Sequence, residues 1–385
     1  MNAETNPTPE DILIVDDTPD NLRLLSQILT EQGYRVRAVT SGSRALASVE
    51  VSIPDLILLD IRMPEMDGYE VCERLKTDPK AKDIPIIFIS ALNEIQDKVK
   101  AFTVGGVDYV TKPFQFEEVL ARVETHLALR KLQKQLQVAN EKMEQELALA
   151  GEVQASFLPG KIPQIPGWQL SVSLIPARET SGDFFDIISL PDGRVGLLVA
   201  DVVDKGVGAA LFMALSSTLL RTYAMEYPSQ PEQVFSTVNE RILRDTNAKQ
   251  FVTVFYGILD SNNGKLLYGN AGHCPPVLLN TKDGNKPQFL KRTGVPLGIF
   301  EDATWEQKEV QIAPRDMLVL YTDGISEAQN AELAFYGSNR LLNSIYRKLG
   351  GTAEQYKQSI LDDVHEFIEH RALQDDIALI ITIRE

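Results

Sequence analysis

Hydrophobic and polar positions follow three different patterns along the chain. Up to about residue 128, short apolar runs alternate with amphipathic segments of helical spacing, the runs being DILIVDD, YRVRAV, DLILLD, IPIIFIS and VDYV. Buried β-branched runs separated by amphipathic segments are typical of a parallel sheet covered by helices on both faces. Residues 11–128 are therefore predicted to form a doubly wound α/β domain, and the polar residues 1–10 a disordered N-terminus.

The second pattern begins near Leu129. Up to Leu158 the chain has no proline and a single glycine, Gly151. Its apolar residues recur mostly three or four positions apart, at Leu129, Leu132, Leu136, Ala139, Met143, Leu147, Ala150, Val153 and Phe157. Such a stripe favours a parallel coiled coil over residues 129–158, and hence a homodimer. The alternative is a solvated connector helix, which would not need the stripe.

The third pattern covers residues 159–385 and is rich in strands. The strand-like segments are WQLSVSLIP, FFDIISL, RVGLLVAD, FVTVFYGILD, KLLYGNAG, DMLVLYTDG and IALIITI. Helical patterns follow Lys205 and Pro231, and two more lie between about residues 331 and 370. Many strands with segregated helices predict an α+β domain, a β-sandwich with outer helices.

Composition limits the functions that are open to the chain. The 385 residues carry a formal net charge of −16 with a sequence pI of about 4.8, so no nucleic-acid partner is expected. Two cysteines cannot build a disulfide scaffold, which fits a reducing compartment. No apolar run reaches ~18 residues, and the first residues lack the apolar core of a signal peptide. We expect a cytoplasmic protein without a membrane partner.

Acidic residues end the first and third predicted strands, at Asp16, Asp17 and Asp60. Because the carboxyl ends of neighbouring parallel strands meet at one edge of a sheet, these carboxylates are expected to lie together and to bind Mg²⁺. Ser90 and Lys112 follow the fourth and fifth strands. A hydroxyl and an ammonium beside an aspartate suit a nucleophile that accepts a phosphoryl group. A single strand-end aspartate is more often a helix cap, but the complete set favours the phosphoacceptor site.

These residues lie in motifs that resemble the response-regulator receiver family: IVDD, LLDIRMPEMDG, IS, and a tyrosine before TKP. The resemblance implies a flavodoxin-like fold in which Asp60 accepts phosphate from a histidine kinase. The other roles that it implies are Mg²⁺ ligands (Asp17, Asp60 and the backbone carbonyl of Arg62, with Asp16 in the same acidic group), a phosphoryl-binding lysine (Lys112) and a conformational switch (Ser90 and Tyr109).

Acidic residues also adjoin the strand-like segments of the third region, in SGDFFD, LLVADVVDKG, LYTDGISEA and LQDDIALI. Sets made only of carboxylates favour Mg²⁺ or Mn²⁺ over Zn²⁺. Two such ions ~3.5–4 Å apart can clamp a phosphate for in-line attack. Taken alone, an Asp-Gly pair such as Asp323-Gly324 is usually just a turn.

Together with NAGHCPP and GVPLGIF, these motifs resemble the protein phosphatase 2C (PPM) superfamily, and in particular its bacterial sporulation and stress-response subgroup. GEVQASFLP resembles the first helix of that subgroup. The resemblance implies two Mn²⁺ or Mg²⁺ ions, held by the catalytic acids Asp183, Asp201, Asp323 and Asp375 and by the backbone carbonyl of Val202. Asp186 and Asp376 are expected to support these ligands from behind.

The two resemblances together imply a two-component response regulator whose output is a metal-dependent protein serine/threonine phosphatase, gated by phosphorylation of Asp60. The expected partners are a histidine kinase and a phosphoserine or phosphothreonine protein, which would be an anti-sigma-factor antagonist or a similar partner-switching protein. The alternative is an adaptor whose phosphatase-like domain has lost catalysis and only binds a partner. The sequence leaves open the direction of gating and the roles of Asp204 and His273.

Overall fold

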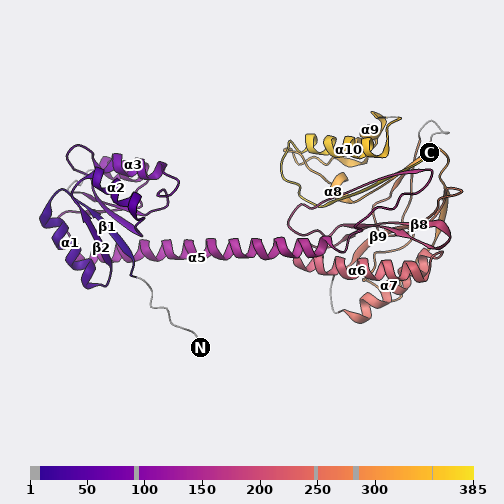
Figure 1. Ribbon diagram of the computed structural model, residues 1–385, viewed down its shortest axis with the longest axis horizontal. Coiled ribbons are helices and arrows are strands. Elements are labelled where there is room, and N and C mark those ends of the chain that lie inside the picture. Colours follow the sequence, from indigo (N-terminus) through magenta and orange to yellow (C-terminus); the bar gives the residue numbers. More distant parts are fainter. Residues whose placement is uncertain (1–8, 91–94, 247–249, 281–285, 349) are drawn as a thin grey trace. The chain divides into compact units, whose positions relative to one another are not determined.

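The computed structural model describes residues 9–90, 95–246, 250–280, 286–348 and 350–385 (Figure 1). The chain divides into two compact units, Met1–Glu141 and Lys142–Glu385. Residues 1–8 of the predicted disordered N-terminus lie outside the described residues. The domain limits drawn from the sequence after residues 10, 128 and 158 stay predictions.

The first unit contains a five-stranded parallel sheet in the order β2-β1-β3-β4-β5. Its strands are β1 (Asp11–Val15), β2 (Arg35–Val39), β3 (Leu56–Asp60), β4 (Ile86–Ser90) and β5 (Asp108–Thr111). Its helices are α1 (Pro19–Glu31), α2 (Gly42–Val51), α3 (Gly68–Thr77), α4 (Ile95–Thr103) and the beginning of α5 (Phe116–Ala155). The predicted doubly wound α/β fold is confirmed.

Alternate residues of the central strands belong to two cores, one on each face of this sheet. In β1, Leu13 and Val15 pack with α2 and α3, whereas Ile12 and Ile14 pack with α1 and α5. Strands β1, β3 and β4 are buried at every position, whereas the edge strand β2 is partly exposed. Burial on both faces explains why the central strands read as continuous apolar runs in the sequence.

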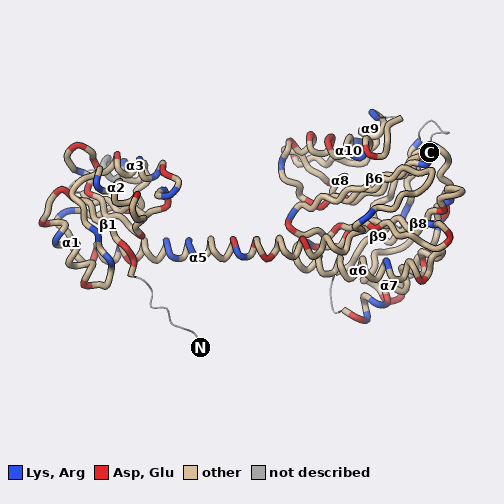
Figure 2. Tube along the Cα trace, viewed as in Figure 1, with Lys and Arg blue, Asp and Glu red and all other residues tan. Residues whose placement is uncertain are grey.

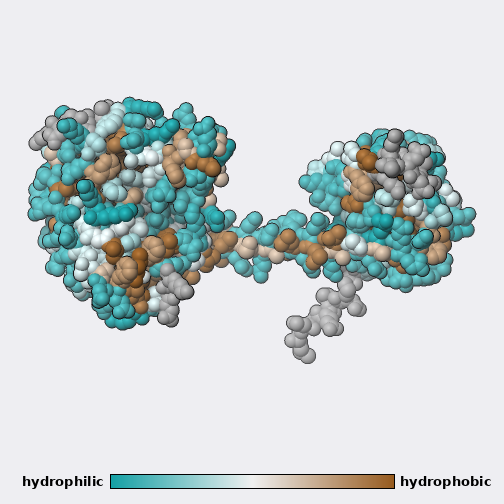
Figure 3. Space-filling view, turned by 180° about the vertical axis from the view of Figure 1, so that it is seen from behind, coloured by the Kyte–Doolittle hydropathy of each residue, from teal (hydrophilic) through white to brown (hydrophobic). Residues whose placement is uncertain are grey.

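Helix α5 is one continuous helix of 40 residues. Its first turns pack into the first unit through Val119, Val123 and Leu127, so the predicted boundary at residue 128 falls inside a helix rather than at its start. Beyond them, the side chains of Leu132 and Leu136 are 62% and 63% exposed. Apolar side chains follow one another along this helix in Figure 3, with acidic and basic residues interspersed in Figure 2.

The second unit contains two five-stranded antiparallel sheets, in the orders β13-β10-β9-β8-β7 and β12-β11-β14-β15-β6. The first sheet consists of β7 (Phe184–Ser189), β8 (Arg194–Val202), β9 (Val252–Asp260), β10 (Lys265–Ala271) and β13 (Lys308–Gln311). The second consists of β6 (Trp168–Ile175), β11 (Val277–Asn280), β12 (Lys286–Phe289), β14 (Met317–Tyr321) and β15 (Ile377–Arg384). A short 3-10 helix, η1 (Pro191–Gly193), joins β7 to β8.

The two sheets of this unit enclose a core in which Leu197 and Phe255 meet Leu318 and Ile380. Helices α6 (Val207–Glu226) and α7 (Pro231–Asp245) cover the outer face of the first sheet. Helices α9 (Gly337–Tyr346) and α10 (Ala353–Phe367) cover the second, and the short α8 (Asp323–Ser326) follows β14 (Figure 1). This is the predicted sandwich with outer helices.

Helix α6 is long and apolar enough to cross a membrane by length and composition alone. The sequence analysis expected no such segment. In this unit, Phe212, Met213 and Leu220 of α6 are buried against the first sheet. This packing accounts for the apolar composition of α6, because core helices of soluble proteins can be equally long and apolar.

Candidate functional site

The structure brings the three receiver acids together at one edge of the first sheet. The ligand oxygens of Asp16, Asp17 and Asp60 lie within 4.8 Å of one another. Strands β1 and β3 pair directly, so their carboxyl ends carry these side chains to the same place. Asp16 and Asp60 are buried, whereas Asp17 is exposed. Oxygen ligands grouped in this way suit a divalent cation such as Mg²⁺.

Lys112 reaches this cluster from the end of β5. Its Nζ lies 2.8 Å from Asp16 Oδ2 and 3.0 Å from Asp60 Oδ2. Asp16 also accepts hydrogen bonds from the backbone N–H of Thr18, at 2.8 Å, and from the Asn21 amide. The carboxylate of Asp16 is therefore fixed by several donors.

The ionisation of this group follows from its burial and from Lys112. Burial raises the pKa of Asp60, the Lys112 ammonium opposes the rise, and the charges of Asp16 and Asp17 add to it. For Lys112, burial acts to lower the pKa, but its bonds to Asp16 and Asp60 outweigh burial and raise it. The receiver site thus contains its own permanent cation.

The remaining predicted receiver residues surround the same edge. Ser90 is buried at the end of β4, and its backbone carbonyl accepts the Lys112 N–H at 2.8 Å. Tyr109 lies on β5 and packs edge-on against Phe102, with ring centroids 6.2 Å apart. Arg62 lies two residues beyond Asp60, with its side chain exposed.

In the second unit, each sheet contributes two acids. Antiparallel pairing of β7 with β8 brings Asp183, just before β7, next to Asp201, near the end of β8. Pairing of β14 with β15 likewise brings Asp323, after β14, close to Asp375, before β15. The charges of Asp323 and Asp375 both act on Asp201, so the acids of the two sheets form one electrostatic cluster.

The pKa values of the acids in this cluster are strongly perturbed by burial and by the neighbouring acids. Burial raises the pKa of Asp183 well above its usual range, and the neighbouring Asp201 adds to the rise. Burial and the charge of Asp323 raise the pKa of Asp201 to about 7. The pKa of Asp323 is also raised by burial, then by Glu327 and Asp375. In this cluster, burial and the mutual repulsion of the acids outweigh the positive charge of the nearby Lys205.

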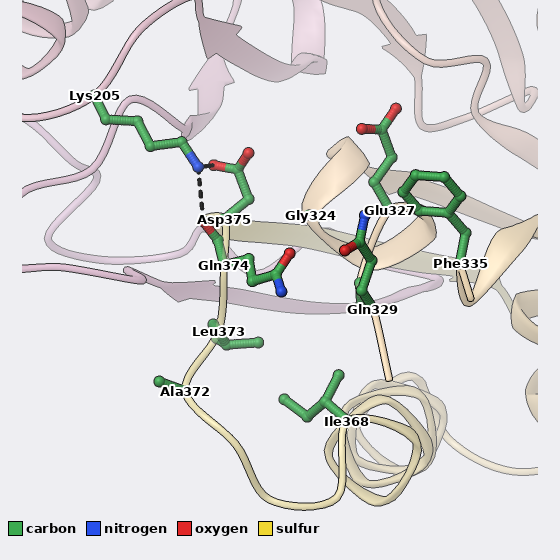
Figure 4. Close-up of a pocket in the computed structure, with 11 residues that line it drawn as sticks. Lys205, Gly324, Glu327, Gln329, Phe335, Ile368, Ala372, Leu373, Gln374 and Asp375 are labelled. Atoms are coloured by element: carbon green, nitrogen blue, oxygen red, sulfur yellow. Dashed lines mark hydrogen bonds and ion pairs between the residues drawn. The ribbon is translucent and has the colours of Figure 1, made fainter. Parts of the chain in front are cut away.

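Lys205 is the cation that lies beside this cluster. Its Nζ is 2.9 Å from Asp375 Oδ1 and 2.7 Å from the Gln374 carbonyl (Figure 4). Lys205 is 39% exposed and Asp375 45%, so this pair sits at the outer side of the cluster. Within the described part of the chain, the Lys205 ammonium makes no ion pair with the buried Asp183.

The donor set fits divalent cations by its chemistry. Asp183 Oδ2 is buried and, among the described residues, has no hydrogen-bond partner. The backbone N–H of Val202 donates to the Gly182 carbonyl at 3.3 Å, which sets Val202 beside Asp183. The four acids are spread more widely than the receiver acids. Among the described residues, only the receiver acids form a group of three or more whose potential ligand atoms all lie within 4.8 Å of one another. A buried, unpaired carboxylate oxygen among raised pKa values is what a cation would satisfy.

Asp376 and Asp186 occupy different places behind the cluster. Asp376 accepts the backbone N–H groups of Ala177 and Gly182, each at 2.7 Å, and so holds the turn that carries Asp183. Asp186 instead pairs with Arg221 of α6 at 2.6 Å. Asp376 thus anchors the turn that carries Asp183, whereas Asp186 ties β7 to the helix above it, and the supporting role of both acids stays a prediction.

His273 and Asp204 have local roles that the sequence left open. His273 Nδ1 lies 2.8 Å from the Thr253 hydroxyl, and its Nε2 lies 3.1 Å from the Tyr321 carbonyl. Burial lowers the pKa of His273 to about 4, so the ring is neutral near pH 7 and links strands behind the acids. Asp204 adopts a left-handed conformation, with φ of 85°, and its carboxylate accepts the Lys205 N–H at 2.8 Å.

The Stage II sporulation protein E (SpoIIE) family model matches residues 191–384, which is half of the chain. The chain belongs to the SpoIIE family. The response regulator receiver domain model matches residues 12–124. The protein thus contains a receiver domain followed by a SpoIIE domain with a PP2C-like fold, in agreement with the motifs.

Two related proteins are similar to this chain over more than half of its length. Protein IcfG of Synechocystis is 31% identical over 268 residues, which cover 62% of this chain and 41% of IcfG. Phosphoserine phosphatase RsbU of Bacillus subtilis is 28% identical over 264 residues, which cover 68% of this chain and 74% of RsbU. The similarity therefore spans less than half of the length of IcfG.

Solved structures agree on the fold of the SpoIIE domain. The SiaA-PP2C domain of Pseudomonas aeruginosa superposes with a TM-score of 0.57 at 20% identity, covering 64% of this chain and 98% of that one. The RsbU and RsbW domains of Rv1364c from Mycobacterium tuberculosis give a TM-score of 0.50 at 25% identity, covering 58% and 63%.

Two residues that contact the SpoIIE acids, Lys205 and Thr322, are not predicted from the sequence. Lys205 stands in the DVVDKG turn directly after a strand-end acid, and a lysine near a strand end, as in the receiver TKP motif, is the signal that would have found it. Thr322 hydrogen-bonds Asp183 and accepts the Ala378 N–H at 2.8 Å. A threonine directly before an aspartate carries no comparable signal.

Proposed function

We propose that this protein is a two-component response regulator whose output is a metal-dependent phosphatase acting on phosphoserine or phosphothreonine in a protein. The observation that carries the phosphatase part is the cluster of the buried Asp183 with the half-buried Asp201 and Asp323, whose burial and mutual charges raise their pKa values. In a SpoIIE domain, acids arranged in this way are suited to binding cations and, through them, a phosphate.

Within the SpoIIE domain, the proposed holders of two Mn²⁺ or Mg²⁺ ions are Asp183, Asp201, Asp323, Asp375 and the backbone carbonyl of Val202. When bound, such ions supply positive charge to the phosphoryl oxygens and make water a better nucleophile. The chain itself fixes the carboxylates in advance. Asp376 holds the Asp183 turn through the Gly182 N–H, and Lys205 orients Asp375. Preorganised charge of this kind lowers the cost of reaching the transition state.

In the receiver, an Asp60 oxygen is proposed to attack the phosphorus of a phosphohistidine on a histidine kinase. The new O–P bond forms as the P–N bond breaks, and the released imidazole nitrogen takes up a proton. Lys112, 3.0 Å from Asp60, offsets the negative charge that arrives. Asp16, Asp17 and Asp60, with the Arg62 carbonyl, are the proposed Mg²⁺ site.

The proposed substrate is a phosphorylated anti-sigma-factor antagonist or a similar small regulatory protein, and the proposed location is the cytoplasm. Support for a phosphoprotein substrate comes from the relative RsbU, which is named a phosphoserine phosphatase. Phosphate release from candidate phosphoproteins, measured with purified protein, tests this part. A protein that is inert toward every phosphoserine protein would contradict it.

Control of the SpoIIE domain is proposed to pass through the last turns of α5. The side-chain amide of Gln154 hydrogen-bonds both the N–H and the carbonyl of Ser181, two residues before Asp183. A Cβ on Gly151 would lie 2.1 Å from the Glu179 carbonyl, so the helix approaches this segment as closely as only glycine permits. A change in α5 therefore has a direct route to the backbone that carries Asp183.

The exposed apolar stripe of α5 is proposed to pair with a second copy as a parallel coiled coil. Leu136 and Met143 are 63% and 56% exposed in the single chain, so replacing both by glutamate leaves the two cores intact. The mass in solution of this double variant is expected to fall from that of a dimer to that of a monomer, with its response to phosphorylation lost. A wild type that is monomeric in both states contradicts the dimer.

An adaptor without catalysis is the competing function. Hydrolysis of p-nitrophenyl phosphate by the full chain, across a range of Mn²⁺ and Mg²⁺ concentrations, separates the two. The phosphatase proposal predicts cation-dependent turnover that chelation abolishes. Complete inactivity under all of these conditions favours the adaptor.

A further inference from the structure

A cleft of about 270 Å³ opens beside the phosphatase acids (Figure 4). Asp375 lines it, and so does Gly324, which directly follows Asp323 in the chain. Two of the proposed cation-holding acids are thus at its wall or adjacent to it. Apart from Asp375 and its partner Lys205, the lining residues are not among the proposed cation-holding groups, so these walls are available for another task.

One wall is a hairpin that follows α8. Gln329 and Phe335 form an antiparallel bridge, and the Tyr336 N–H donates to the Ala328 carbonyl at 2.8 Å. Tyr336 is buried, and its hydroxyl donates to Asp363 at 2.6 Å, which anchors the base of the hairpin. Phe335 nevertheless remains 58% exposed. A large aromatic ring is therefore held rigidly beside the acids with part of its surface open to a ligand.

The opposite wall is the segment from Ile368 to Asp375. Ile368 is buried, and the next two residues, Glu369 and His370, have φ values of 55° and 57°. Two consecutive non-glycine residues in the left-handed region are costly, and strained backbone of this kind clusters at binding sites. The far end of the segment is fixed by the contact of Asp375 with Lys205 at 2.9 Å.

The chemistry of the two walls suits an extended peptide. Figure 4 shows the side chains of Gln329 and Gln374 extending from opposite walls into the space between them. A side-chain amide both donates and accepts hydrogen bonds, as a peptide backbone requires. Leu373 and Phe335 add apolar surface, and Glu327 adds an exposed carboxylate at the rim. The lysine that lines the cleft is already paired with Asp375, so the rim favours a positively charged ligand.

We infer that this cleft binds the stretch of the phosphoprotein substrate next to its phosphorylated residue, with a large apolar side chain against Phe335 and Leu373 and a basic side chain near Glu327. The inference rests on the proposed phosphatase function and deepens it by naming the substrate class. The phosphate lies at the acids, and the neighbouring residues of the same peptide lie between the hairpin and the segment before Asp375.

The test compares short synthetic phosphoserine peptides in which leucine or alanine occupies one position at a time on either side of the phosphoserine. With the full chain and Mn²⁺, leucine at one of these positions is expected to raise kcat/KM over alanine about tenfold. Phe335→Ala is expected to reduce this leucine-to-alanine ratio to near one. Because both peptides meet the same variant, the ratio is insensitive to a general loss of activity.

The matched control is Leu333→Ala. Leu333 is 71% exposed in the same hairpin but does not line the cleft, so this variant is expected to keep the wild-type ratio. A second ratio, arginine over glutamate at the flanking positions, is expected to fall in Glu327→Gln. The inference is overturned if no position prefers leucine, if the preference survives Phe335→Ala, or if Glu327→Gln leaves the charge preference unchanged.

The failure of this inference is distinguishable from the failure of the proposed function. If the protein hydrolyses p-nitrophenyl phosphate but shows no preference among the peptides, or does not hydrolyse them, the cleft assignment is overturned. The proposed phosphatase activity is then unaffected. Absence of p-nitrophenyl phosphate hydrolysis at every cation concentration overturns the proposed function itself.

Discussion

The protein contains two acidic sites built on the same plan but balanced differently. In both, pairing of neighbouring strands brings aspartates together, within one sheet in the receiver and within each of two sheets in the SpoIIE domain, and a lysine lies close by. In the receiver, Lys112 touches both Asp16 and Asp60. In the SpoIIE domain, Lys205 touches the outer Asp375, while the buried Asp183 keeps an oxygen without a partner among the described residues.

This difference teaches how much each site depends on an external cation. Lys112 provides positive charge from within the chain to receiver acids whose oxygens lie within 4.8 Å of one another. In the SpoIIE domain the pKa of Asp201 stands at about 7, because burial and neighbouring acids are not compensated. The second site is therefore expected to change more, in both stability and activity, when cations are added.

The largest effect is expected from Asp60→Asn, which breaks the receiver side of the comparison. The amide has almost the same shape but cannot form an acyl phosphate, so labelling by radioactive acetyl phosphate should be lost completely. Asp201→Ala, in the other domain, should be labelled as well as the wild type. Stoichiometric labelling of Asp60→Asn would show that the phosphoacceptor lies elsewhere.

Removal of one SpoIIE acid is expected to have the next largest effect. Asp201→Ala and Asp323→Ala should each lower p-nitrophenyl phosphate turnover at least ~100-fold, since several kcal/mol of charge stabilisation are lost. Asp302→Ala, which changes an exposed aspartate outside the cluster, serves as the control. Activity of either acid variant within a few-fold of wild type would count against the two-cation site.

Binding of Mn²⁺ is expected to raise the stability of the SpoIIE unit. The chain has two tryptophans, Trp168 and Trp305, and both lie in the SpoIIE unit, so tryptophan fluorescence reports the unfolding of that unit. Mn²⁺ at 100 times its dissociation constant should stabilise the unit by about 2.7 kcal/mol, a rise of several degrees in its midpoint. Asp201→Ala should show little of this rise, and an equal rise in both proteins contradicts the assignment.

A smaller effect is expected on the pH dependence of the free energy of unfolding, which reports on His273 behind the acids. The folded-state pKa of His273 is lowered to about 4, so its stabilising contribution is present above the unfolded value of 6.5 and declines as the pH falls toward 4. Between pH 7 and pH 5 the wild type should lose about 2 kcal/mol more than His273→Gln in urea unfolding followed by tryptophan fluorescence. Identical pH profiles would mean that the histidine is not held neutral.

The sequence predicted the strands and the grouping of acids because both depend on local patterns. Continuous apolar runs identify central strands, and aspartates at strand ends are carried to one edge by any sheet of the predicted kind. The same reasoning could not find the partner of Asp186, because Arg221 lies 35 residues away on a helix whose rotation depends on packing. The predicted domain limit at residue 128 lies inside α5, because the apolar pattern of that helix changes where its burial ends.

Contacts that depend on side-chain direction were equally out of reach. Lys205 could have pointed to solvent or to any of several acids, and only the fold brings it to Asp375. The anchoring of Ser181 by Gln154 joins residues 27 apart through a turn that has no sequence signature. The Gln154–Ser181 contact is the proposed link between α5 and the SpoIIE acids.

The central claim is that phosphorylation of the receiver controls the SpoIIE phosphatase. It is tested most directly by the rate of p-nitrophenol release in Mn²⁺, measured with and without acetyl phosphate, for the wild type and for Asp60→Asn. The account predicts that acetyl phosphate changes the wild-type rate and leaves that of Asp60→Asn unchanged. An active wild type whose rate is the same in both conditions, or an Asp60→Asn variant that responds as the wild type does, would contradict it.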